Sequence, residues 1–108
     1  MKYGLRKDII EKINTVFADF PLVDEAVIYG SRAKGNFKNG SDIDISLKGD
    51  ELSLKELNKI SYVLDDLLLP YTFDLSIYHN IDNPDLSEHI RRVGKTFYSI
   101  DKKDSQNK

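Results

Sequence analysis

Residues 30–45 read GSRAKGNFKNGSDIDI, and this stretch decides which fold the chain can form. Its first part is rich in glycine, asparagine and basic residues, which favours a loop with at most a short helical turn after Ser31. From Ser41 to Leu47 apolar and polar residues alternate, which predicts a β-strand because successive side chains point to opposite faces. The apolar face of this strand holds Ile43, Ile45 and Leu47. The opposite face holds Asp42, Asp44 and Ser46.

Three other short segments have the pattern of strands. Glu25–Tyr29 is short and mostly apolar, and it is bounded by turn residues. Tyr71–Ile77 alternates between an aromatic and aliphatic face and a polar face that includes Asp74. Lys95–Ile100 is predicted as a short last strand. Two of the predicted strands therefore carry aspartates on the face that points away from their apolar side chains.

Three segments have the apolar spacing of amphipathic helices: Leu5–Phe20, Leu52–Leu68 and Asp85–Val93. In the second of them, Ser53 and Glu56 resemble a capping box at the start. The predicted order is thus helix, strand, strand, helix, strand, helix, strand. This order indicates an α/β or α+β fold with a small mixed β-sheet flanked by helices. The length of 108 residues suits one domain, which we assign to residues 1–100, followed by a polar tail at 101–108.

Composition excludes several classes of function. The chain has 16 basic and 18 acidic residues, so it has no general basic footprint and no direct nucleic-acid partner is expected. It contains no cysteine, which excludes disulfides and thiolate zinc sites. No apolar run approaches the roughly 20 residues of a membrane span, and a cytoplasmic location is predicted.

The aspartates of the two alternating strands predict a metal site. Asp42 and Asp44 are two residues apart, which places both on one face of a strand. Asp74 joins them if the two strands are neighbours in register. Converging carboxylates repel unless a cation lies between them, and oxygen ligands favour Mg²⁺ or Mn²⁺. The alternative is a solvated strand face that carries charge without function.

The loop before these aspartates predicts a phosphate site. Gly30 permits close backbone approach, and the Ser31 hydroxyl and the N–H groups that follow can hold phosphate oxygens. Arg32, Lys34 and Lys38 add positive charge that suits a triphosphate. An ordinary turn with a solvated basic surface is the alternative.

Two other polar features are assigned structural roles. His79 and His89 have no motif partner at a metal-ligand spacing, so surface or packing roles are predicted. The stretch Glu88–Arg92 is predicted as a solvated helix face, with contact to an acidic partner as the alternative.

Taken as one string, Gly-Ser-x-Ala-x-Gly at 30–35 followed by Ser-Asp-x-Asp at 41–44 resembles the signature of the DNA polymerase β-like nucleotidyltransferase superfamily. The chain is most similar to the minimal nucleotidyltransferase branch of that superfamily, from its first helix to about Tyr98. The resemblance implies the polymerase β-like fold, with ATP as substrate and Mg²⁺ or Mn²⁺ as cofactor.

The resemblance also implies roles for individual residues. Asp42 and Asp44 would hold metal ions, and Asp74 would be the third catalytic carboxylate and metal ligand. Gly30 and Ser31 would bind the nucleotide's phosphates. The remaining nucleotide-binding candidates are Arg32, Lys34 and Ser41. Arg32 would help with the triphosphate or anchor the loop, and Lys34 stands where the branch often carries arginine, so it keeps the charge without the bidentate fork.

Minimal nucleotidyltransferases of this type are commonly the antitoxins of small helical HEPN toxins. The resemblance therefore implies transfer of AMP from ATP to a hydroxyl of a HEPN partner, a tyrosine being the expected acceptor. Two other functions stay open. The chain could neutralise its partner by masking it without catalysis, or it could transfer a nucleotide to a small molecule or an RNA end.

Overall fold

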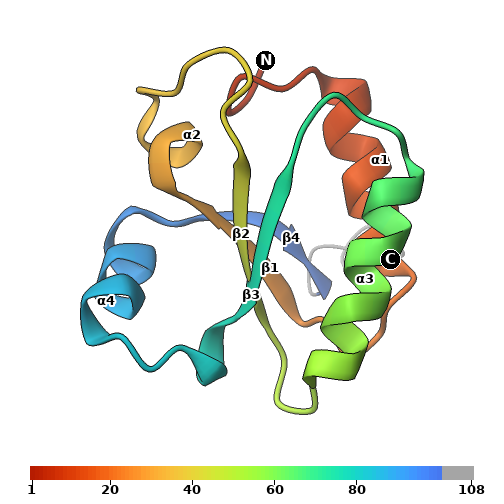
Figure 1. The fold of residues 1–108 in the computed structure, drawn as a ribbon, viewed down its shortest axis with the longest axis vertical. Helices are drawn as coiled ribbons and strands as arrows, with labels where there is room; N and C mark the ends of the chain where they lie inside the picture. Colours follow the sequence, from red (N-terminus) through yellow and green to blue (C-terminus); the bar gives the residue numbers. More distant parts are fainter. Residues whose placement is uncertain (101–108) are drawn as a thin grey trace.

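The computed structural model describes residues 1–100, and its centre is a four-stranded β-sheet (Figure 1). The strands are β1 (Glu25–Tyr29), β2 (Ile43–Lys48), β3 (Phe73–Ile77) and β4 (Lys95–Ser99). Their spatial order is β3-β2-β1-β4. β2 and β3 are parallel, whereas β1 is antiparallel to both of its neighbours, so the predicted small mixed sheet is confirmed. The predicted tail, residues 101–108, lies outside the described residues.

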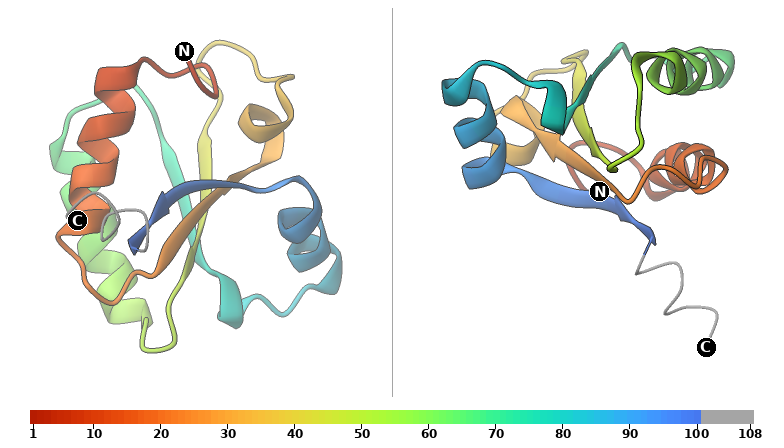
Figure 2. Two further views of the ribbon diagram at one scale, coloured as in Figure 1. Left: turned by 180° about the vertical axis from the view of Figure 1, so that it is seen from behind. Right: turned by 90° about the horizontal axis from the view of Figure 1, so that it is seen from below.

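Helices lie on both faces of this sheet (Figure 2). They are α1 (Lys7–Ala18), α2 (Gly30–Lys34), α3 (Leu54–Asp66) and α4 (Pro84–Val93), with a 3₁₀ turn, η1 (Tyr78–Asn80), after β3. α1 and α3 lie side by side on one face, whereas α4 lies on the other face near α2. The three long helices are confirmed, and η1 is an addition to the prediction. No helix among residues 1–100 has the length and apolar character to cross a membrane.

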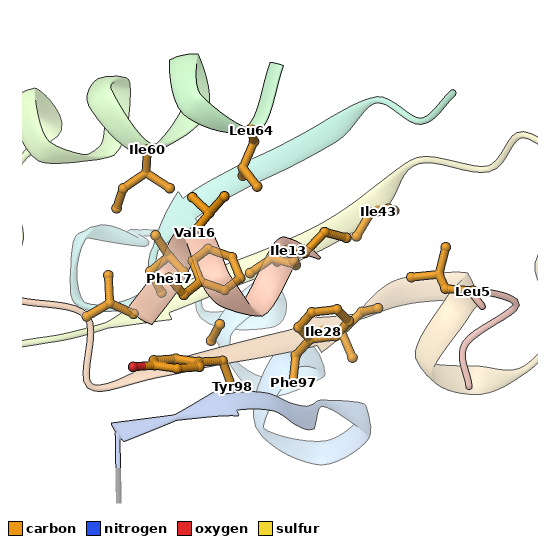
Figure 3. Close-up of a cluster of buried hydrophobic side chains, with 14 of the residues drawn as sticks. Leu5, Ile13, Val16, Phe17, Ile28, Ile43, Ile60, Leu64, Phe97 and Tyr98 are labelled. Carbon is orange, nitrogen blue, oxygen red and sulfur yellow. The ribbon is translucent and has the colours of Figure 1, made fainter. Parts of the chain in front are cut away.

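The face covered by α1 and α3 forms the main hydrophobic core (Figure 3). α1, which forms within the predicted helix Leu5–Phe20, contributes the buried residues Ile9, Ile13, Val16 and Phe17. α3 contributes Ile60 and Leu64, which are almost fully buried. The strands contribute Ala26, Ile28, Ile43, Ile45 and Leu47, all at 0% exposure. The alternation of β2 is thus confirmed, because its apolar residues all point into this core.

The opposite face of the sheet is covered less completely. There Val27 and Tyr29 of β1 form a second, smaller apolar cluster with Ile90 of α4. The same face of β2 carries Asp44 and Ser46, because these alternate with the core residues. α4 therefore covers the β1 side of this face.

The ends of α3 show where the sequence pattern was right and where it was wrong. The Ser53 hydroxyl accepts a hydrogen bond from the Glu56 backbone N–H at 3.4 Å, as one half of a capping box does. At the other end the predicted stripe ran to Leu68, but the helix ends at Asp66. Leu68 has a φ of 55° and is 88% exposed. Because Pro70 cannot continue a helix, the chain leaves it here and Leu68 turns away from the core.

Candidate active site

The polar face of the sheet brings Asp44 and Asp74 together. They occupy the second positions of β2 and β3 and are direct partners in the parallel ladder. Residues paired in this way point to the same face of a sheet, so the two carboxylates are neighbours. Asp44 is half-buried and Asp74 is exposed. The neighbouring register on which the predicted convergence depended is therefore present.

Asp42 approaches this pair from outside the sheet. The strand was predicted to begin at Ser41, but β2 begins at Ile43, so that boundary was wrong. The reason is a turn in which the Ser41 N–H donates to the Lys38 carbonyl at 3.0 Å, while the Lys38 N–H donates to the Ser41 hydroxyl at 2.9 Å. Asp42 is exposed, and its charge reaches Asp44. The ladder therefore holds Asp44 but not Asp42.

The closeness of these carboxylates changes the acidity of Asp44. Burial raises the pKa of the Asp44 carboxyl, and the negative charges of Asp74 and Asp42 raise it further. The positive charge of Arg32 and the nearby His89 act in the opposite direction to a smaller extent. Negative charge on Asp44 is thus disfavoured in the protein alone, and a cation beside it would relieve the repulsion.

The donors suit a hard divalent cation, since all of them are carboxylate oxygens. Among residues 1–100, however, no three His, Cys, Asp or Glu side chains are already gathered closely enough to hold one ion together. A cation beside Asp44 would take its remaining ligands from water or phosphate oxygens, as Mg²⁺ commonly does in phosphoryl-transfer sites. The assignment of Asp42, Asp44 and Asp74 as metal ligands stays a prediction.

The turn from β1 into α2 lies directly against Asp44. Gly30 is the first residue of α2 and has a φ of 71°, which glycine adopts without strain. A Cβ atom added to Gly30 would overlap with Oδ2 of Asp44. No side chain caps the start of α2, so its first N–H groups lack a capping partner beside the carboxylates. The half-buried Ser31 is in this first turn, as the phosphate-site prediction requires.

The other predicted nucleotide-binding residues are placed differently. Arg32 is 3% exposed, and each of its side-chain nitrogens donates to a backbone carbonyl. Nε and Nη2 donate to Ser41 at 3.1 and 2.8 Å, and Nη1 donates to Tyr3 at 2.8 Å. Of the two roles expected for Arg32, these contacts match anchoring of the loop. Lys34 is exposed at the end of α2.

Tyr29, which no sequence pattern singled out, also lies beside these carboxylates. It is paired with Asp44 across the antiparallel ladder, is 8% exposed, and packs edge-on against the ring of His89 at 6.2 Å. Burial raises the pKa of its phenol, a side-chain hydrogen bond with Ser76 opposes the rise, and the charges of Asp74 and Asp44 add to it. Tyr29 thus connects the carboxylates with α4, since it is paired with Asp44 and packs against His89.

The sequence alone does not place His89 and Tyr29 beside the carboxylates, because their positions depend on how distant segments pack. The packing role predicted for His89 is confirmed by its contact with Tyr29, but its place beside the carboxylates is visible only once α4 is folded onto β1. Alternation within β1 puts Tyr29 on the same face as Val27, and only the pairing with β2 identifies that face as the acidic one. In the Glu88–Arg92 stretch, Arg91 and Arg92 are exposed and both pair with Glu88, and its assignment as a solvated helix face stays a prediction.

The sequence also matches the profile of a known family, described as polymerase beta, nucleotidyltransferase, over residues 11–103. The chain belongs to this family. The matched range includes the start of α2 and all three aspartates. No curated protein matches the chain.

Solved structures share the nucleotidyltransferase fold. A toxin–antitoxin structure with AMP-PNP has a chain that matches with a TM-score of 0.68 at 20% identity, covering 94% of this chain and 80% of that one. The structure of the tri-AMPylated Shewanella oneidensis HEPN toxin in complex with MNT antitoxin also contains a matching chain, with a TM-score of 0.67 at 18% identity. The match covers 94% of this chain and 79% of that one. A chain of the toxin–antitoxin structure MntA–HepT matches with a TM-score of 0.66 at 18% identity and with the same coverage of both chains. The predicted polymerase β-like fold is confirmed.

Proposed function

We propose that this nucleotidyltransferase moves AMP from ATP to a tyrosine hydroxyl of a HEPN toxin and thereby acts as the antitoxin. The observation that carries the proposal is the in-register pair of Asp44 and Asp74 directly beside the uncapped start of α2. The similar folds support the choice of nucleotide and partner, since one was solved with AMP-PNP and another with an AMPylated HEPN toxin.

The start of α2 would bind the triphosphate. Its N–H groups carry partial positive charge, and the absence of a side chain on Gly30 lets this turn lie directly against Asp44. Ser31 can add a hydroxyl donor, and the exposed Lys34 can reach an anion from the end of the short helix.

The carboxylates would organise the reacting atoms. Asp42 and Asp44 would hold Mg²⁺ or Mn²⁺, which when bound neutralises charge on the triphosphate and the leaving group. Asp74, on the exposed edge of the pair, would accept the proton of the incoming tyrosine hydroxyl. The tyrosine oxygen forms a bond to the α-phosphorus, the bond from that phosphorus to the bridging α–β oxygen breaks, and pyrophosphate leaves.

The acceptor can reach the site because Asp74 is exposed and β3 is an edge strand of the sheet. An acceptor approaching along this edge meets Asp74 before the half-buried Asp44. The described residues therefore leave an open approach on the β3 side, opposite the side that α4 covers.

The test is incubation of the purified chain with ATP, Mg²⁺ and a small HEPN protein from the same organism, read by intact mass. We expect one or more AMP units on a tyrosine of the HEPN protein. Asp44→Asn should lower the rate by at least about 10²-fold, because the chain loses a negative ligand at the reaction centre. Asp65→Asn, an identical change at an exposed position of α3, should have no effect.

The same experiment separates the alternatives. A tight complex that inhibits the HEPN protein without any mass gain, and that survives Asp44→Asn, would contradict catalysis and favour masking. Transfer to RNA or to a small hydroxyl compound with no HEPN protein present would contradict the proposed acceptor.

A further inference from the structure

The buried guanidinium of Arg32 joins segments that are far apart in the sequence. Besides its bonds to the Tyr3 and Ser41 carbonyls, its Cζ atom lies 5.2 Å from the ring centroid of Phe37 and 5.1 Å from that of Tyr71. We call these five residues the Arg32 cluster. No ion pair of Arg32 occurs among residues 1–100, so carbonyl dipoles and aromatic faces stabilise its charge.

The N-terminal turn, residues 2–5, contacts Arg32 through the Tyr3 carbonyl. Its ends are joined by two backbone hydrogen bonds of 3.2 and 2.8 Å. Tyr3 has a φ of 58°, which is uncommon for a residue with a side chain, and Gly4 has a φ of 72°. A Cβ atom on Gly4 would overlap with the Phe37 ring and lie 3.0 Å from Nη1 of Arg32. The turn therefore packs tightly against the cluster and directs the Tyr3 carbonyl at the guanidinium.

Asp42 is the carboxylate that depends on this arrangement. Ladder hydrogen bonds hold the backbone of Asp44 and Asp74, but Asp42 precedes the first residue of β2. The Ser41 carbonyl and the Asp42 N–H belong to one planar peptide unit. Two Arg32 nitrogens bind that carbonyl, so they fix the peptide plane from which Asp42 projects.

From this geometry we propose that Arg32 is a positioning residue for Asp42, braced by the N-terminal turn. The proposal rests on the proposed function in one respect, namely that Asp42 is a metal ligand. Arginine suits the task because its planar fork gives two donors to one carbonyl and a third to another, which a lysine ammonium cannot reproduce in the same geometry. At 3% exposure the guanidinium is too buried to touch a nucleotide, so its contact with the site runs through Ser41, in addition to the effect of its charge on Asp44.

A residue that acts through another should change metal binding without removing a ligand. Arg32→Lys keeps the charge and removes the fork. Loss of groups that orient metal ligands typically weakens metal binding by about 10–100-fold, and we expect Mn²⁺ affinity to fall by about tenfold. The reporter is carboxyl ¹³C NMR of Asp-labelled protein titrated with Mn²⁺ alone. In the wild type Mn²⁺ should broaden the Asp42 and Asp44 signals, and in Arg32→Lys the same broadening should require about tenfold more Mn²⁺.

Ile60→Val is the matched control for lost stability. It removes one methylene from the main core, on the far side of the sheet, and leaves the Arg32 cluster intact. We expect it to lower the thermal midpoint while both signals still broaden. Broadening of Asp42 in Arg32→Lys at wild-type Mn²⁺ concentrations would overturn the proposal, as would a wild type in which Mn²⁺ never broadens Asp42.

Gly4→Ala tests the brace and covers the case in which Arg32→Lys does not fold. Position 4 is remote from Asp42 in sequence, and the atoms nearest to a Cβ added there belong to Phe37 and Arg32. We expect weaker broadening of both signals at a given Mn²⁺ concentration, and unchanged broadening would contradict the brace. The two proposals fail separately, because a wild type that binds Mn²⁺ at Asp42 yet transfers no AMP refutes the function and leaves the positioning role standing.

Discussion

The two faces of the sheet serve different purposes although the same strands build both. The face under α1 and α3 is closed, and its side chains are apolar and nearly all buried. The other face carries Asp44, Ser46, Asp74 and Ser76 and is covered by α4 only on its β1 side. Burial on the first face holds the backbone in place, so the second can keep like charges close together. Stability and chemistry are therefore separated by the parity of residues along each strand.

The largest expected effect is a loss of stability from a substitution on the closed face. Phe17→Ala removes a fully buried ring whose centroid lies 5.9 Å from that of the Tyr98 ring. We expect a loss of about 3–5 kcal/mol in unfolding free energy. That is a large share of the roughly 5–15 kcal/mol that stabilises a typical domain. Urea unfolding followed by circular dichroism measures it, with the exposed Thr15→Ala of the same helix as control. A loss below about 1 kcal/mol would mean that this face does not dominate stability.

The next effect is on the open face. Gly30→Ala should lower AMP transfer by about 10²-fold, because its new Cβ displaces Asp44 and small misplacements of reacting groups are costly. Gly35→Ala is the matched control, since Gly35 also has a positive φ, 86°, but has no atom within 4 Å of the added Cβ. Both variants share the backbone strain, so initial rates should differ between them by the overlap alone. Equal rates would show that contact with Asp44 is not critical.

A smaller effect, on unfolding free energy, is expected at Ser46 and Ser76, which lie on the same face of β2 and β3 as the carboxylates. Ser76 donates a hydrogen bond to Ser46 at 3.1 Å, and Ser46 is 0% exposed. Alanine at either position should cost about 1 kcal/mol, and the double variant should cost less than the sum, because the second change removes a buried group that the first left unpaired. A double-mutant cycle by urea unfolding measures this coupling. Simple additivity would argue against the hydrogen bond.

The smallest expected effect is a gain in stability. Folding raises the pKa of Asp44, so its protonated form favours folding below the pKa of the unfolded chain, and that contribution is lost as pH rises through the folded pKa. At pH 7 without metal, Asp44→Asn should therefore raise Tm by about 1–3 °C, a modest change because solvent screens a half-buried group. The gain should shrink toward pH 4.

Metal sharpens this last prediction. Mg²⁺ should stabilise the wild type more than Asp44→Asn, because a ligand that binds the folded state opposes unfolding and the variant lacks one of the proposed metal ligands. Differential scanning fluorimetry with EDTA or Mg²⁺ measures both effects. A lower Tm for Asp44→Asn without metal would contradict the charge repulsion.

Most of the fold follows from the sequence because its periodicities are clean. Alternation in β2 and β3 and the apolar spacing in α1 each predicted which side chains face the main core. They did not predict the degree of burial, since Ser46 on the polar face is buried whereas Phe73 and Leu75 are only partly buried. The boundary at Ser41 was wrong because a hydrogen-bonded turn and the Arg32 side chain compete with the ladder, and neither leaves a local pattern. Tyr29 and His89 were not assigned to the site since their neighbourhood depends on β1–β2 pairing and on how α4 packs.

Parallel pairing of β2 and β3 also has a consequence for the order of folding. Antiparallel neighbours can meet through a tight turn, but parallel strands need a crossover, here through α3. Asp44 and Asp74 therefore meet only through a long-range contact, the kind that forms slowly because a long loop must close first. During synthesis the chain cannot pair these carboxylates until β3 has left the ribosome, so a nascent fragment ending before β3 lacks the Asp44–Asp74 pair.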